Sequence, residues 1–186
     1  VQELEAQLAE ANKQLSTTAD YWQQMGDSFM EKESFTVALD CYKKSIEMDE
    51  SNASAWMKKG QALSRLNKYG EALIAYNKSI ERDSHLAEAW YEKGLTLAHL
   101  ALYNESIAAL DEAIDLHPQV ALPWYSKGIA LANLEKFNES LMALNKALER
   151  DGNLSGAWYS KALILADLGR NSESIAAFEK TIDLDP

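Results

Sequence analysis

The sequence predicts an all-α fold, a right-handed superhelical solenoid of antiparallel helix hairpins, from two observations. All the tryptophans of the chain lie 34 residues apart, at Trp22, Trp56, Trp90, Trp124 and Trp158. A fixed period of this length is typical of repeat arrays, in which each unit buries its apolar face only against its neighbours. Within each period, apolar residues follow helical spacing through two segments separated by a short break. Each unit is therefore expected to be a pair of helices.

Composition narrows the classes of partner. The 186-residue chain has a formal net charge of -11, and nucleic acid and anionic membranes are bound mainly by lysine and arginine. We expect neither as a partner. Cys41 is the only cysteine, so we expect it to pack as a small apolar residue rather than to bind zinc or form a disulfide within the chain. No apolar run is long enough for a membrane helix, which favours a soluble, cytoplasmic protein.

Residues 1–18 precede the first repeat and carry an apolar stripe. Val1, Leu4, Leu8, Ala11 and Leu15 alternate at spacings of three and four, as in a coiled coil. Two heptads are too few to decide between a helix that caps the first repeat, the end of a longer coiled coil that pairs chains, and disorder. Ser16, Thr17 and Thr18 then offer candidate N-caps for the next helix. Because the chain begins without methionine and stops at Pro186, where a repeat ends, we expect a fragment of a longer protein.

The repeats occupy 19–52, 53–86, 87–120, 121–154 and 155–186, and their columns indicate how the helices pair. Glycine inside a helix costs about 1 kcal/mol relative to alanine, so a repeated glycine suggests close approach of the paired helix. The expected facing column is also small. The glycine column is Gly26, Gly60, Gly94, Gly128 and Ala162, and the small column is Ala38, Ala72, Ser106, Ser140 and Ser174.

These columns resemble the tetratricopeptide repeat (TPR), whose order of Trp, Gly, large apolar residue, Ala, aromatic residue, Ala and Pro is matched in five units. The large apolar column is Phe29, Leu63, Leu97, Leu131 and Leu165, and the aromatic column is Tyr42, Tyr76, Leu110, Leu144 and Phe178. The final proline is present only at Pro118 and Pro186, with Glu50, Ser84 and Gly152 elsewhere. The resemblance implies a right-handed superhelix whose first helices line a concave face.

Helix ends are expected at several positions. Asn104-Glu105 and Asn138-Glu139 place a capping residue and an acid where second helices should begin. Pro123 falls in the first turn of its helix, where a missing N–H costs little.

A surface of the first helices that the core does not need is the candidate peptide-binding groove. One residue after each Trp comes a column that is tyrosine in the last three units, and four residues further comes an aliphatic column. Exposed apolar strips of this kind usually mark interaction sites, and tyrosine suits them. Lateral packing between neighbouring first helices, or consensus filler, is the alternative interpretation. The predicted groove residues are Tyr91, Leu95, Leu122, Tyr125, Ile129, Tyr159 and Leu163.

Charged columns give two further expectations. Lys59, Lys93, Lys127 and Lys161 precede the small residue of each unit, and we expect their stems to cover apolar surface while each ammonium reaches an acid on the facing helix. A basic stripe for an acidic ligand is the alternative.

The second expectation concerns one TPR subset, which clamps the C-terminal carboxylate of chaperone tails with Lys, Asn and Arg side chains of successive first helices. Here those places hold Gln23, Asp27, Lys58, Glu88 and Glu92, and the later windows fit no better. We predict no tight binding of such tails.

No chemistry of catalysis stands out. His85, His99 and His117 lack metal-site spacing, no Gly-rich phosphate loop occurs, and no pattern places a nucleophile beside a base. We expect no enzyme activity, no cofactor and no metal. The leading hypothesis is a protein-interaction scaffold that binds a peptide or partner helix in the groove. The rival is an assembly module that forms homo-oligomers through the N-terminal helix, or end to end through Ile175, Phe178 and Ile182 of the last helix.

Overall fold

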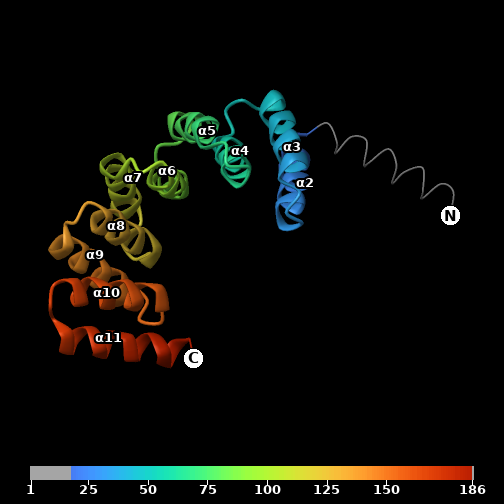
Figure 1. Cartoon of the computed structure of the whole chain (residues 1–186). Coiled ribbons are helices and arrows are strands. Elements are labelled where there is room, and N and C mark those ends of the chain that lie inside the picture. Colours follow the sequence, from blue (N-terminus) through green and yellow to red (C-terminus); the bar gives the residue numbers. More distant parts are fainter. Residues whose placement is uncertain (1–17, 186) are drawn as a thin grey trace, which may run out of the picture. The chain divides into compact units, whose positions relative to one another are not determined.

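The computed structural model describes residues 18–185 and contains ten helices in this range (Figure 1). Each of the five repeats holds two, so the all-α fold of helix hairpins is confirmed. The first helices are α2 (Ala19–Glu31), α4 (Ala53–Arg65), α6 (Ala87–His99), α8 (Ala121–Asn133) and α10 (Ser155–Asp167). The second helices are α3 (Phe35–Met48), α5 (Tyr69–Arg82), α7 (Tyr103–Leu116), α9 (Phe137–Arg150) and α11 (Asn171–Leu184). The helix predicted over residues 1–18 lies, except for Thr18, outside the described range.

The helices group into two compact units that divide after Ala89. In the first unit, α2 packs on α3, α3 on α4, and α4 on α5. Its core is centred on Leu39, Tyr42, Met57 and Tyr76. The lone Cys41 is buried in the same unit and unpaired, as expected for a residue that packs.

The second unit follows the same plan. Its pairs α8–α9 and α10–α11 pack as hairpins, and α7 packs on α8 as α9 does on α10. The core cluster of the last two repeats includes Leu141, Leu144, Ile164 and Leu165. Burial of an apolar stripe against the neighbouring hairpin is therefore what holds each helix in place.

The glycine column does mark close approach of paired helices, and the large column of the second helix faces it together with the expected small column. A Cβ built on Gly60 would lie 2.5 Å from Cε1 of Tyr76, and one on Gly94 would lie 2.7 Å from Cγ of Leu110. The large column thus fills the space that glycine leaves. The small column serves a different purpose in the later repeats, because the Ser106 hydroxyl donates to the Gly94 carbonyl at 2.7 Å.

The same hydroxyl bond recurs from Ser140 to Gly128 and from Ser174 to Ala162. Each of these serines is buried. A satisfied buried hydroxyl adds stability, whereas an unsatisfied one would cost it, so the three later hairpins carry a polar cross-link that the alanines of the first two repeats cannot make.

Every hairpin turn contains one residue with positive φ. These residues are Glu33, Asn67, Ala101, Glu135 and Gly169. The N–H of the next residue bonds back to a carbonyl five residues earlier, for example Leu102 to Leu97 at 3.0 Å. This is the Schellman arrangement, which satisfies the last carbonyls of the helix.

The capping predictions have mixed outcomes. Thr18 caps α2 by accepting from the N–H of Tyr21 at 3.2 Å, and Pro123 lies in the first turn of α8 as predicted. Asn104 and Asn138 are not N-caps, because α7 and α9 begin one residue before them. The prediction was wrong because the Schellman turn fixes the entry to the second helix through backbone bonds. The predicted acids do lie in the first turns of α7 and α9.

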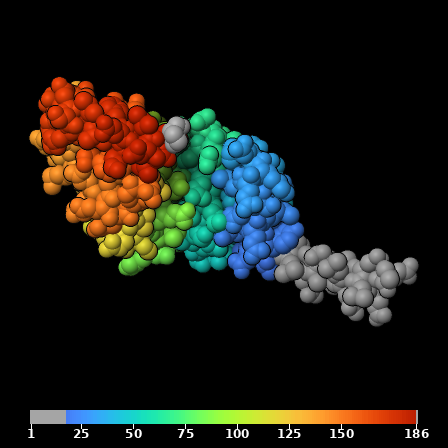
Figure 2. All heavy atoms as spheres, turned by 90° about the horizontal axis from the view of Figure 1, so that it is seen from below, coloured from blue at the N-terminus to red at the C-terminus, as the bar shows by residue number. Residues whose placement is uncertain are grey.

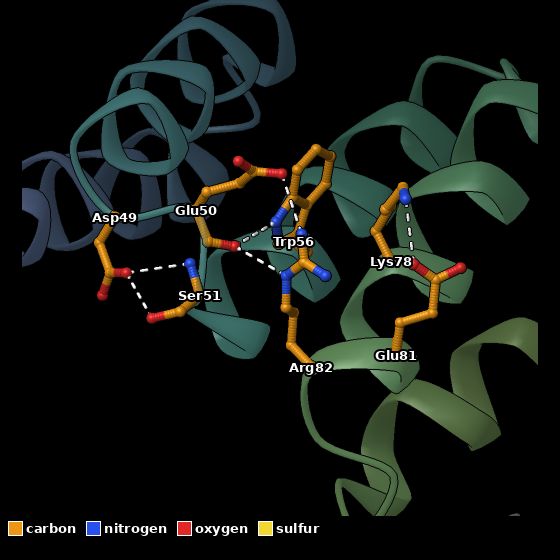
Figure 3. A network of polar contacts seen from close by, with 7 residues as sticks. All are labelled: Asp49, Glu50, Ser51, Trp56, Lys78, Glu81 and Arg82. Atoms are coloured by element: carbon orange, nitrogen blue, oxygen red, sulfur yellow. Dashed lines mark hydrogen bonds and ion pairs between the residues drawn. The ribbon is translucent and has the colours of Figure 1, made fainter.

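In the turns between repeats, one backbone carbonyl accepts hydrogen bonds from side chains of the neighbouring helices. The Glu50 carbonyl accepts from the Trp56 indole N–H at 3.0 Å and from Nε of Arg82 at 3.2 Å, while Nη2 of Arg82 bonds the Glu50 carboxylate at 2.9 Å (Figure 3). The Pro118 carbonyl takes the same bonds from Trp124 and Arg150. Because the acceptor is a backbone carbonyl, the hydrogen bond from tryptophan does not require the family's proline. Glu50 replaces it in the first repeat, and in the fourth the Gly152 carbonyl accepts from the Trp158 indole N–H.

Candidate functional site

The seven predicted groove residues lie on three first helices of the second unit, and none of them is fully buried. Tyr91 and Leu95 belong to α6, whereas α8 carries Leu122, Tyr125 and Ile129, and α10 carries Tyr159 and Leu163. The exposed fraction is 45% for Leu122, 49% for Tyr159 and 43% for Leu163. The remaining four are half-buried.

Three of the seven come together in a pocket of about 320 Å³. Its apolar lining consists of Leu95, Tyr125 and Ile129, with the small residues Ala98 and Ala130. The polar lining consists of His99, Tyr103, Ser126 and Asn133. Tyr91, Leu122, Tyr159 and Leu163 do not line it.

Sequence reasoning missed the polar lining, although a signal was available. His99 and Asn133 are one repeat apart and lie one helical turn after Leu95 and Ile129, so they share the face of those residues. Asn133 uses its amide to donate to the Ile129 carbonyl at 2.9 Å. Tyr103 enters from the start of α7, a position that no pattern in the first helices indicates.

The tyrosine column serves partly as packing between neighbouring first helices. A Cβ at Gly156 would lie 3.1 Å from the Tyr125 hydroxyl, and Tyr125 also packs against the core of the last two repeats. Burial raises the pKa of Tyr91, against the opposing effect of a hydrogen bond with Ser126. Tyr159 meets Phe178 of its own hairpin edge to face, at 5.9 Å between ring centroids. Tyr91 and Tyr125 therefore contact the next first helix, and Tyr159 is the most exposed of the three.

The corresponding positions in the first unit do not form an apolar surface. Met57 is buried, and the Gln23 carboxamide oxygen accepts from Asn52 at 3.1 Å. One carboxylate oxygen of Asp27 accepts from the Tyr42 hydroxyl at 2.8 Å and from the Lys58 ammonium at 2.6 Å. The apolar site is thus a feature of the second unit.

The lysine column is arranged only in part as predicted. Each ammonium lies over the ring of the tryptophan three residues earlier, at 4.7 Å for Lys59, 5.0 Å for Lys93, 5.7 Å for Lys127 and 5.0 Å for Lys161. Within residues 18–185, only Lys127 of this column forms an ion pair with an acid on a second helix, Asp111. The charges of Glu71 and Glu173, on the paired second helices, also act on Lys59 and Lys161 without a direct ion pair. In all four repeats the aromatic face one turn away attracts the cation within the same helix. Burial of these side chains lowers the pKa of Lys59, Lys93 and Lys161.

Residues 18–185 contain no group of three His, Cys, Asp or Glu side chains placed to hold a metal ion. Among the helices of this range, none combines the length and the apolar character needed to cross a membrane.

Solved structures with similar folds were found by comparison. MamA from Desulfovibrio magneticus RS-1, residues 41 to the end, superposes with a TM-score of 0.82 at 19% identity, covering 90% of this chain and 94% of that chain. A second MamA crystal structure gives 0.80 at 23% identity, with coverage of 91% and 93%. YrrB, described as a TPR protein with an unusual peptide-binding site, gives 0.76 at 21% identity, with coverage of 96% and 92%. At these identities the likeness shows the fold alone.

The sequence itself matches a family. No curated protein matches the chain. Tetratricopeptide repeat models match residues 24–87 and 125–186, and a further one matches residues 87–120. The matched segments cover most of the chain, so it belongs to the tetratricopeptide repeat family.

Proposed function

We propose that this chain is a non-enzymatic interaction module that binds a peptide or a partner helix on the first-helix surface of its second unit. The observation that carries the proposal is the pocket walled by Leu95, Tyr125 and Ile129. It is large enough for a bulky side chain, and its lining also contains hydroxyl and amide groups of the kind that bond a peptide backbone.

Exposed apolar residues extend this surface beyond the pocket. Leu122 on α8 and Leu163 on α10 are both more than two-fifths exposed. Apolar side chains that the fold leaves uncovered on neighbouring helices are typical of interaction surfaces. The printed description of YrrB as a TPR protein with a peptide-binding site supports the same role for this chain.

Binding is tested with the full 186-residue chain as the target of a random peptide display library. A selected peptide is synthesised and its affinity measured by isothermal titration calorimetry against the wild type, Ile129→Asp and Met142→Asp. Ile129 walls the pocket, whereas Met142 is 70% exposed on α9 and does not line it. We expect Ile129→Asp to weaken binding tenfold or more, and Met142→Asp to leave it unchanged.

Equal affinity of the wild type and Ile129→Asp would contradict the proposed surface. Circular dichroism on both variants establishes that they remain folded. If the library yields no binder, peptide recognition itself is contradicted.

A second candidate function is assembly through the last helix. Ile175 and Ile182 on α11 are 59% and 63% exposed, and the space-filling view shows atoms of α11 at the surface (Figure 2). The hypothesis predicts that Ile175→Glu with Ile182→Glu lowers the mass measured by light scattering. Deleting residues 1–18 tests the other predicted contact between chains in the same assay. A monomeric wild type at high concentration would exclude both contacts.

A further inference from the structure

Resting on the proposed function, we propose that the peptide bound at this pocket is basic. One bulky apolar side chain enters between Leu95, Tyr125 and Ile129, and lysine or arginine residues flank it. The partner is thus a cationic segment with a single apolar anchor.

The size and lining of the pocket define the anchor. Its volume of about 320 Å³ is at the lower end of the range for small-molecule sites, roughly 300–1,000 Å³. Leu95, Tyr125 and Ile129 line it, and the alanines at positions 98 and 130 take up little of the space. A leucine, methionine or phenylalanine side chain buries well in such a space.

The lysines of the three first helices are directed away from this surface. Successive helical residues turn by about 100°, so a residue two positions away lies on nearly the opposite side. Lys93 is two residues from Leu95, as Lys127 is from Ile129. Their ammonium groups lie over Trp90 and Trp124, which places both cations outside the pocket.

The same relationship holds on α10. Lys161 lies two residues from both Tyr159 and Leu163, and its ammonium lies over Trp158. Each lysine of α6, α8 and α10 therefore faces away from the proposed binding surface.

Acidic side chains lie close to the groove residues in the sequence of α6 and α10. Glu92 follows Tyr91 directly on α6, and Asp167 lies one turn after Leu163 on α10. The pocket is lined by Ala98, His99 and Asn133 from the C-terminal turns of α6 and α8, where the helix dipole is negative and favours cations.

The turn after α8 adds one charge of each sign, Glu135 and Lys136. These offset each other, as Arg170 and Glu173 do after α10. With the lysines directed to the other side, the remaining charges on α6, α8 and α10 are acidic. The formal charge of -11 on the whole chain attracts a basic segment at longer range and disfavours docking of a second copy.

The test uses three short synthetic peptides with blocked termini and one common frame. The first has a leucine flanked by lysines, the second replaces the leucine by serine, and the third replaces the lysines by glutamate. Fluorescence anisotropy with the full chain should give the tightest binding for the first peptide. We expect each replacement to weaken it about tenfold or more, and added salt to weaken the first peptide as well.

Two pairs of protein variants assign the effects to the site. Ala98→Leu fills the pocket and should weaken the leucine peptide about tenfold, whereas Ala176→Leu makes the same change on the exposed face of α11 and should not. Asp167→Asn should reduce the salt dependence more than Asp115→Asn on α7.

Each contrary outcome is distinct. Equal binding of the glutamate or serine peptide, or no effect of Ala98→Leu, overturns the inference. Failure of all three peptides while library peptides bind overturns it too, but leaves the proposed function standing. Self-association of the chain that Ala98→Leu abolishes would identify a second copy as the occupant instead.

Discussion

The ring of Tyr76 lies directly against the backbone of Gly60, and a Cβ at that position would stand 2.5 Å from the ring carbon Cε1. Tyr76 is fully buried, so the ring has no space into which to move. Gly60→Ala should therefore destabilise the chain by about 1–3 kcal/mol, as overpacking does, although alanine is the better helix former. Urea unfolding followed by circular dichroism measures the change.

Gly70 provides the matched control, because a Cβ there would meet nothing within 4 Å. Gly70→Ala, also in a helix, should stabilise the chain by about 0.5–1 kcal/mol. Equal effects of the two substitutions would show that helix propensity, and not the tyrosine ring, decides the glycine column.

The positive-φ position of the hairpin turns allows a prediction of the opposite sign. Ala101 has a φ of 57°, whereas the equivalent residue of the last repeat is Gly169 with a φ of 71°. A non-glycine residue in this conformation destabilises the folded state by about 1–2 kcal/mol. Glycine avoids this strain, but its more flexible unfolded state offsets part of the gain. Ala101→Gly should raise the midpoint of urea unfolding, and Gly169→Ala should lower it. The same direction of change in both variants would contradict this account.

The fold could be predicted from the sequence because its period is a property of the chain itself. Trp, Gly and large apolar residues recur every 34 residues, and the structure places two helices in each period. Details that depend on competition between neighbours could not be predicted in this way. The Lys93 ammonium lies over the Trp90 ring, and Gly94 faces the Leu110 side chain as well as Ser106, whose hydroxyl bonds the Gly94 carbonyl.

The candidate site was predictable only in part. Leu95, Tyr125 and Ile129 were found from their columns, and the pocket unites them. The sequence could not decide which side chains of a column remain open, because Tyr125 is covered on one side by the helix of Gly156. Tyr159 has the same chemistry one repeat later and is much more exposed.

The buried phenol of Tyr42 predicts a loss of stability at high pH. Burial, and then the hydrogen bond to Asp27, raise the pKa of Tyr42 well above the usual value of 10.0. The folded chain therefore keeps a proton that the unfolded chain releases, so the contribution is complete below pH 10 and falls as the pH rises beyond it.

The comparison of wild type with Tyr42→Phe isolates this contribution. Urea unfolding at several pH values gives the free energy of unfolding of both proteins. Above pH 10 that of the wild type should fall relative to that of Tyr42→Phe, by at most about 1.4 kcal/mol per pH unit. The lowered pKa values of Lys59 and Lys93 make stability rise with pH instead. Because both proteins contain these lysines, their effect cancels in the comparison. A difference that is independent of pH would contradict the burial of the phenol.

Peptides with an acidic sequence and a free C-terminal carboxylate should not bind tightly. Lys58, the one cation in the place of the carboxylate clamp, is already paired with Asp27 at 2.6 Å. We expect no binding of such a peptide at micromolar concentration in calorimetry. Affinity in that range, lost when the carboxylate is amidated, would show that the pair opens to accept a ligand.

The two tyrosines that follow tryptophan in the last repeats should differ in their effect on stability. Tyr125 packs on the core of the last hairpins, with its hydroxyl over Gly156, so Tyr125→Ala leaves a space that the neighbours cannot fill and should cost about 2–4 kcal/mol. Tyr159 is 49% exposed and meets Phe178 edge to face, so Tyr159→Ala should cost less than about 1 kcal/mol. Urea unfolding of both variants measures the two costs. If the costs were equal, Tyr125 would be as free for ligand contact as Tyr159, and the distinction between a packing tyrosine and an open one would be wrong.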